Sequence, residues 1–360
     1  MKQTQNTPPV PPFMILVLLA LLAALWAGLL RIGWQWPTLT SSLIGLHGPL
    51  MVSGFLGTLI GIERAVALRQ RWCFASPLLI GLGALLLIMG IQLKIGMLLL
   101  VLGSAVMVLI QAQILRIHYA LHTVVIGAGA LLLFGGNLLW LLGKPISQIS
   151  YWWAGFLLLV IAGERLELSR VLRLSAGVKK LFGIAAAIFG LGLLVALFRY
   201  SLGVRIASAG VVALALWLWR YDLARRNIHK SDLVRYIAWN LLIGYAWLTV
   251  SGLLGMYFAG TQGGVYYDAW LHTLFLGFAM SMIFAHAPII LPAILGITVP
   301  YRRILYSAPV LLHFSLLLRI FGDLTVQQAI RKWGGLLNAL AILAFFATVA
   351  FAVIQGRRKA

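Results

Sequence analysis

The sequence predicts an all-α polytopic membrane protein with about twelve transmembrane helices. Its 360 residues are 62% hydrophobic and only 10% charged, whereas soluble domains average about 25% charged residues. The apolar residues form long runs, and a helix needs about 20 such residues to cross a bilayer. These runs do not alternate with polar residues, as the strands of a membrane barrel do.

The twelve predicted spans follow one another with short connections and form one transmembrane domain, residues 13–355. They cover residues 13–33, 43–68, 73–93, 95–115, 118–142, 150–174, 177–198, 201–221, 233–260, 268–296, 303–322 and 334–355. Residues 1–12 form a polar, proline-rich segment, and residues 356–360 form a basic tail. The first span lacks a small-residue cleavage site and is expected to be retained. Cys73 is the only cysteine, so no disulfide forms within the chain and a thiolate metal cluster is not expected.

The net charge of +21 comes from basic residues that are distributed among the loops and chain ends. With the N-terminus inside, the inner loops and ends hold 20 of the 28 Lys and Arg residues, and the outer side holds 8. This bias places both termini in the cytoplasm and favours the anionic inner leaflet. The predicted location is a bacterial cytoplasmic (inner) membrane. Nucleic acid is excluded as a partner because the charge is not gathered on one face or in one block.

Three stretches repeat one pattern at intervals of four spans. Residues 54–64 read GFLGTLIGIER, residues 155–165 read GFLLLVIAGER, and residues 277–286 read GFAMSMIFAH. Each opens with Gly-Phe and carries an ionisable residue nine positions after the glycine. The pattern predicts three tandem four-helix units, 13–115, 118–222 and 233–355. Coincidence is the alternative, since Gly-Phe is common in membrane helices.

The repeat also predicts a polar cluster in the inner half of the membrane. Units with an even number of helices keep one orientation, so the three repeated helices all run from outside to inside. Glu63, Glu164 and His286 would then lie at similar depth, and we expect them to converge with Arg64 and Arg165. Ionisable groups within a membrane face protein or water and are functional candidates. Alternatively, the two Glu-Arg pairs anchor helix ends in an ion network.

Two histidines are expected near the outer ends of the second and tenth spans. His47 lies seven residues before Gly54, and His272 lies five residues before Gly277. Neutral imidazole is a strong ligand for haem iron, and two axial imidazoles give a low-spin, electron-transferring haem. Small residues nearby, including both glycines, would leave room for the flat macrocycle. We therefore predict a haem site formed by His47 and His272. The alternative is a pair of histidines that reach to the outer membrane surface.

The remaining histidines are weaker metal candidates. His118 and His122 project from one helix face and have the spacing of a metal pair, but an interfacial position at the helix start is favoured. His286 lies ~21 Å along its helix from His272, so the two cannot share a metal. His313 is expected in mid-membrane, as a metal ligand or as a hydrogen-bonded core histidine.

The segments around His47 and His272 resemble known haem proteins. The stretch HGPLMVSGFLG, in an inward-running second helix, resembles the haem-ligand helix of haem-copper oxidase subunit I. The twelve predicted helices of this chain also resemble the twelve helices of that subunit. The closer resemblance is to the NnrS family. It rests on LHGPLMVSGF (46–55), IGYAW (243–247), LHTLFLGF (271–278) and LLLRI (316–320). It covers roughly residues 40–70 and 235–322, while the middle third matches only in hydropathy and in its GER sequence.

The NnrS resemblance implies a haem, of the b type, with copper as a second candidate metal. It also implies a role in nitric oxide metabolism or stress, and partners that include the bilayer, nitric oxide and a quinone or cytochrome as electron partner. The chain departs from the oxidases because its sixth and seventh spans contain no histidine, where oxidases take their copper ligands. Pro49 also stands where NnrS relatives carry a second histidine. A dioxygen-reducing haem–copper centre is therefore not expected.

The sequence thus favours an NnrS-like haem-binding membrane protein and leaves open whether it is an enzyme. One alternative is a proton-coupled or solute transporter that uses Glu63, Glu164 and His286. Broken helices and inverted repeats are typical of such transporters, but the repeats here are parallel and tandem. The other alternative is a membrane accessory protein without a cofactor. A visible absorption spectrum distinguishes the three.

Overall fold

The computed structural model confirms an all-α, multi-pass membrane fold. It describes residues 10–295 and 299–357, and in these residues twelve helices are long and apolar enough to cross a membrane, with no strand. Most of the predicted N-terminal segment (residues 1–9) and the tail residues 358–360 lie outside the described residues.

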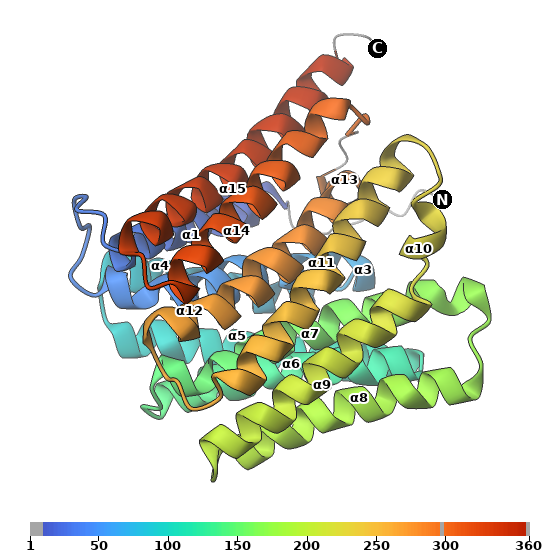
Figure 1. Ribbon diagram of the computed structural model, residues 1–360, viewed down its shortest axis with the longest axis horizontal. Helices are drawn as coiled ribbons and strands as arrows, with labels where there is room; N and C mark the ends of the chain where they lie inside the picture. Colours follow the sequence, from blue (N-terminus) through green and yellow to red (C-terminus); the bar gives the residue numbers. More distant parts are fainter. Residues whose placement is uncertain (1–9, 296–298, 358–360) are drawn as a thin grey trace. The chain divides into compact units, whose positions relative to one another are not determined.

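The first of two compact units covers residues 1–156. Its second span is assembled from four short elements in succession, and its third span from two, η3 and α4. Helices α1, α4, α5 and α6 are labelled in Figure 1. The elements are α1 (Pro11–Arg31), η1 (Leu43–Leu46), α2 (His47–Pro49), η2 (Leu50–Gly57), α3 (Thr58–Leu68), η3 (Arg71–Phe74), α4 (Ala75–Met89), α5 (Leu93–Ile117) and α6 (Leu121–Leu141). Helix α7 (Ile146–Leu168) begins in this unit and ends in the next one.

The second unit covers residues 157–360. Its tenth span is likewise assembled from three elements, α12, η5 and α13. The elements after α7 are η4 (Ser169–Leu172), α8 (Ala176–Ala196), α9 (Tyr200–Tyr221), α10 (Ala224–Asn227), α11 (Asp232–Tyr257), α12 (Gly264–His272), η5 (Thr273–Met280), α13 (Ser281–Leu295), η6 (Arg303–Tyr306), α14 (Ser307–Leu324) and α15 (Gln328–Arg357). Helix α14 lies along α15, and α9 lies between α8 and α11 (Figure 1). The division of the chain into three four-helix units stays a prediction.

The described spans agree with the predicted ones to within a few residues, except at a few helix starts. The tenth span begins at Gly264 rather than at residue 268, and the twelfth begins at Gln328 rather than at residue 334. In the twelfth span the added stretch includes Arg331, which forms an ion pair inside the protein. In the tenth span the added turn comes directly before Asp268, which also forms an ion pair there.

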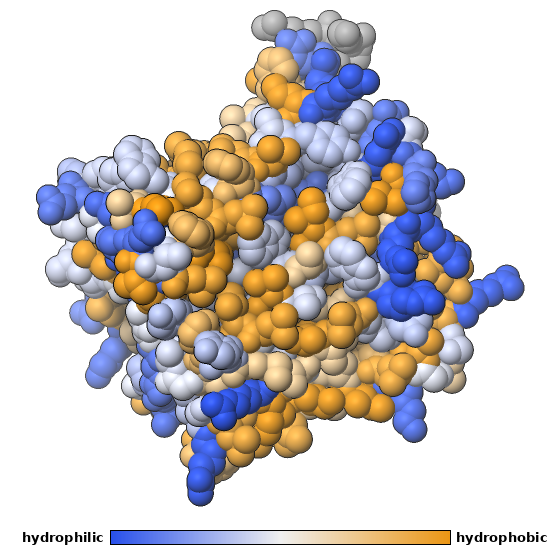
Figure 2. Space-filling model, viewed as in Figure 1, coloured by the Kyte–Doolittle hydropathy of each residue, from blue (hydrophilic) through white to orange (hydrophobic). Residues whose placement is uncertain are grey.

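Large apolar side chains cover much of the outer surface, as expected for a protein that lies in lipid. Leu109, Val310, Phe314 and Leu317 are each about 60% exposed or more. Figure 2 shows extensive apolar surface, with the most hydrophilic side chains gathered along the margins of the view. In water such a surface would aggregate. In a bilayer this apolar surface faces lipid tails that are equally apolar.

Small residues let α8 and α9 approach each other closely. A Cβ atom at Gly192 would collide with the backbone of Ala207, and one at Gly203 would collide with the backbone of Ala196. Helices in lipid associate through such close packing, because lipid tails are as apolar as the side chains and provide no hydrophobic driving force. The glycines are therefore required by the hairpin that α8 and α9 form.

Candidate functional site

His47 is held against the first helix of its unit. Its ring Nδ1 lies 2.7 Å from the backbone oxygen of Ala24 in α1. The ring also packs on Gly28, where a Cβ atom would lie only 2.7 Å from the same nitrogen. Because a carbonyl oxygen can only accept a hydrogen bond, Nδ1 carries the ring proton. The neutral imidazole of His47 therefore has its lone pair on Nε2.

His272, the last residue of α12, has the same tautomer. Its Nδ1 lies 2.9 Å from the backbone oxygen of Asp268 and 3.3 Å from Oδ1 of the same residue. The side chains of His272 and Asp268 are each 13% exposed. Histidines that bind metals almost always donate their other ring N–H to a backbone carbonyl or a carboxylate. His47 and His272 each satisfy this condition within their own unit.

A π-helix follows each of these two histidines. Elements η2 and η5 are eight residues long, and Gly54 and Gly277 are the fifth residue of η2 and η5 respectively. The two segments thus match in length and in position relative to the Gly-Phe pair. π-helices are rare in proteins, and those that do occur are often found at functional sites. This match supports the repeat between the second and tenth spans, whereas α7, which carries the third Gly-Phe pair, is α-helical throughout.

Gly54 and Gly277 are used for helix packing. A Cβ atom at Gly54 would lie 3.0 Å from Cβ of Ala84 in α4, and one at Gly277 would lie 2.5 Å from Cβ of Trp247 in α11. Side chains of neighbouring helices therefore fill the space beside both glycines. The prediction that these two residues leave room for a macrocycle is wrong.

A buried ion cluster surrounds Asp268. Arg319 of α14 donates two hydrogen bonds to its carboxylate, Nε to Oδ2 at 2.9 Å and Nη2 to Oδ1 at 3.0 Å. Arg331 of α15 lies 3.3 Å from Asp268 Oδ1 through Nη2 and 2.7 Å from Asp323 Oδ1 through Nε. The side chain of Asp323 is fully buried. Two carboxylates thus balance two guanidinium groups beside His272.

Sequence reasoning missed this ion cluster. Its members come from three spans, and the two aspartates stand at the edges of the predicted runs 268–296 and 303–322, where a charge is expected to face the membrane surface. One signal could have found it. The chain has only 7 acidic residues, so an aspartate at the edge of a span is unusual here and calls for a buried partner.

Arg165 and His286 lie together in the second unit, as the sequence predicted, and Arg165 also pairs with Asp222. Arg165 donates to Asp222 through Nε at 2.8 Å and through Nη2 at 2.9 Å, and both residues are at least 95% buried. Arg165 Nη1 lies 3.3 Å from Nε2 of His286, whose Nδ1 donates to the backbone oxygen of Met282 at 2.7 Å. The lone pair of His286 therefore faces a guanidinium group, which argues against its assignment as a metal ligand.

The other predicted members of the inner cluster are distributed over both units. Glu63 and Arg64 lie on α3 of the first unit, and Glu164 lies beside Arg165 on α7. Convergence of Glu63 with the second unit stays a prediction. Asp222 was missed because it lies in the short connection after α9, which the sequence presents only as part of a basic loop.

The remaining candidate histidines contact aromatic rings. His313 Nδ1 accepts a hydrogen bond at 3.2 Å from the indole Nε1 of Trp247, so its proton is on Nε2, which argues against metal binding through that atom. The rings of His118 and His122 lie with their centroids 5.4 Å apart. Among the described residues, no three His, Cys, Asp or Glu side chains come together as a metal site.

The comparisons with known proteins give a family but no activity. No curated protein sequence matches the chain. One family model matches residues 11–354, which cover the twelve candidate spans of the described residues except for the last residue of the twelfth. The chain belongs to the family described as "Domain of unknown function (DUF8744)".

Proposed function

We propose that this chain is a haem-binding protein of the bacterial inner membrane, with His47 and His272 as the axial ligands. The observation that carries the proposal is the tautomer that both histidines share. In each ring Nδ1 donates to a backbone oxygen, and Nε2 carries the lone pair. Imidazoles that bind a metal are held in this way.

The other membrane histidines fit the role less well. His286 directs its Nε2 toward Arg165, and His313 has its proton on Nε2. The two matched π-helices add support, because each begins within three residues of its histidine. His47 and His272 are therefore the pair that the residues themselves favour, in agreement with the NnrS-like segments in which they lie.

The chain's own groups would fix how the two imidazoles meet a metal. Ala24 and Gly28 hold the ring of His47 in one orientation. Asp268 does the same for His272, and its carboxylate makes the ring a stronger ligand. A haem with two imidazole ligands transfers single electrons. We assign the protein to electron transfer or nitric oxide metabolism, with a b-type haem and a quinone or cytochrome as electron partner.

The test is the visible spectrum of the full-length protein purified from haem-replete membranes. We expect a haem spectrum of the low-spin type in the wild-type protein. His47→Ala and His272→Ala should each change that spectrum or abolish haem binding. His118→Ala and His229→Ala are controls and should leave it unchanged, because His118 lies just after the end of α5 and His229 lies in the turn after α10. A colourless wild-type protein, or a spectrum that survives both His47→Ala and His272→Ala, would refute the proposal.

A further inference from the structure

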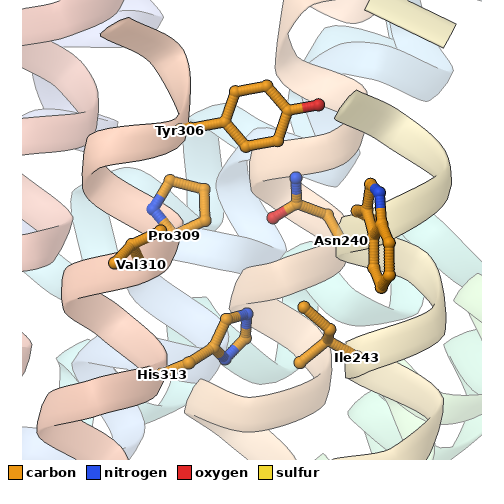
Figure 3. Close-up of a pocket in the computed structure, with 7 residues that line it drawn as sticks. Asn240, Ile243, Tyr306, Pro309, Val310 and His313 are labelled. Atoms are coloured by element: carbon orange, nitrogen blue, oxygen red, sulfur yellow. The ribbon is translucent and has the colours of Figure 1, made fainter. Parts of the chain in front are cut away.

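Helices α11 and α14 line an open cavity of about 220 Å³ within the second unit (Figure 3). Trp239, Asn240 and Ile243 of α11 line one side, and Val310 and His313 of α14 line the other, with Tyr306 at one end. The lining is almost wholly apolar, but it includes one amide and one imidazole. None of the proposed haem ligands lines it.

The amide of Asn240 presents an acceptor to this cavity. Asn240 is 2% exposed. Its Nδ2 donates at 2.8 Å to the backbone oxygen of Tyr236, which fixes the orientation of the amide because a carbonyl can only accept. Its Oδ1 is buried and has no hydrogen-bond partner among the described residues. The acceptor Oδ1 therefore has no donor among the described residues, and a ligand could supply one.

The imidazole of His313 presents a donor. Since its Nδ1 accepts from Trp247, its proton is on Nε2. This Nε2 is also buried and without a hydrogen-bond partner among the described residues. Figure 3 shows the Asn240 amide and the His313 ring both directed into the space between the two helices. One donor and one acceptor without partners thus belong to two residues that line an otherwise apolar cavity.

The size and position of the cavity indicate what kind of molecule it takes. A water molecule occupies only about 30 Å³, while a cavity of about 150 Å³ already holds benzene. The ring of Trp239 is 44% exposed and Val310 is 64% exposed, so the cavity opens at the lipid-facing surface of α11 and α14. The cavity is therefore large enough for a single ring, and an apolar molecule dissolved in the bilayer can reach it.

We infer that this cavity binds the hydroxyl-bearing ring of a membrane-soluble aromatic alcohol, of the phenol or hydroquinone class. A hydroxyl group can donate to Asn240 Oδ1 and accept from His313 Nε2 at the same time. A quinone carbonyl can only accept and would leave Asn240 without a partner. A hydrocarbon would leave both residues without one. The inference does not depend on the haem proposal.

The test uses three probes of matched shape and the full-length protein in nanodiscs. Tetramethylhydroquinone, kept reduced under anaerobic conditions, is compared with tetramethylquinone and tetramethylbenzene by titration calorimetry, with each affinity corrected for partition into lipid. Two added hydrogen bonds should make the hydroquinone bind about tenfold more tightly than the hydrocarbon. The quinone should bind with intermediate affinity.

Two variants locate the binding. Asn240→Leu should bring the affinity for the hydroquinone close to that for the quinone and leave binding of the hydrocarbon unchanged. Val310→Trp should fill the cavity and abolish binding of all three probes. Leu317→Trp is its control, because Leu317 is an exposed apolar residue on the same helix and does not line the cavity. Equal affinity for the three probes, or full binding in Val310→Trp, would overturn the inference.

Discussion

His47 and His272 have the same tautomer but depend on different neighbours. The ring of His47 is fixed by the backbone of α1. The ring of His272 is fixed by the backbone oxygen of Asp268, whose carboxylate also lies 3.3 Å away and belongs to an ion cluster. A single substitution at a neighbouring residue can therefore displace either histidine ring while the histidine itself is retained.

Gly28→Ala should displace the ring of His47. The new Cβ atom would lie 2.7 Å from Nδ1, and overpacking of this kind costs about 1–3 kcal/mol. We expect a lower free energy of unfolding and the loss or alteration of the haem spectrum. Gly45→Ala is the matched control, since a Cβ atom there would have no neighbour within 4 Å. Equal behaviour of the two variants would show that Gly28 does not position His47.

Asp268→Asn should destabilise the second unit. It would leave Arg319 and Arg331 buried with less negative charge to balance them, and breaking a buried ion pair costs about 3–5 kcal/mol. The free energy of unfolding in a denaturant titration measures the effect.

Glu167→Gln serves as the comparison for Asp268→Asn. Its partner Arg170 lies 4.0 Å away, and the two side chains are 41% and 68% exposed. An exposed pair contributes about 0–1 kcal/mol, so this variant should be close to wild type. Similar losses in the two variants would contradict the structural role given to the cluster.

At the scale of elements, hydropathy predicted the helices well but could not predict their internal geometry. An apolar run fixes that a segment crosses the bilayer, because unpaired backbone groups are too costly in lipid. It does not distinguish an α-helix from the π-helices that follow His47 and His272, since both satisfy the backbone. The ion cluster was equally out of reach, because its partners are brought together only by the packing of α12, α14 and α15.

The hairpin of α8 and α9 offers a test of packing by small residues. Gly203→Ala places a Cβ atom against the backbone of Ala196, which has no flexible end to move aside. We expect a loss of about 1–3 kcal/mol in the free energy of unfolding. Gly190→Ala on α8 meets no neighbour within 4 Å and should gain about 0.5–1 kcal/mol from its helix propensity. Destabilisation by Gly190→Ala, or none by Gly203→Ala, would be the contrary result.

At the scale of the whole molecule, composition alone was enough to predict the class of fold, because so few charges and so many apolar runs suit only a bilayer. The positions of the basic residues add an orientation. Reporter fusions at residues 69–72, 222–232 and the C-terminus should all report cytoplasm, because the predicted topology assigns 20 of the 28 basic residues to the side that these segments share. Fusions in the segments 142–146 and 258–263 should report the opposite side. A cytoplasmic signal from both of these, or a periplasmic one from any of the first three, would contradict the topology.

The central claim is that His47 and His272 are the two axial ligands of a haem. Low-temperature electron paramagnetic resonance of the purified, oxidised protein tests it most directly, since the spin state of ferric iron reports its axial ligands. We predict a low-spin ferric signal in the wild-type protein. In His47→Ala and in His272→Ala this signal should be replaced by a high-spin one or lost together with the haem. A high-spin wild-type signal, the absence of haem, or a low-spin signal unchanged in both variants would contradict the claim.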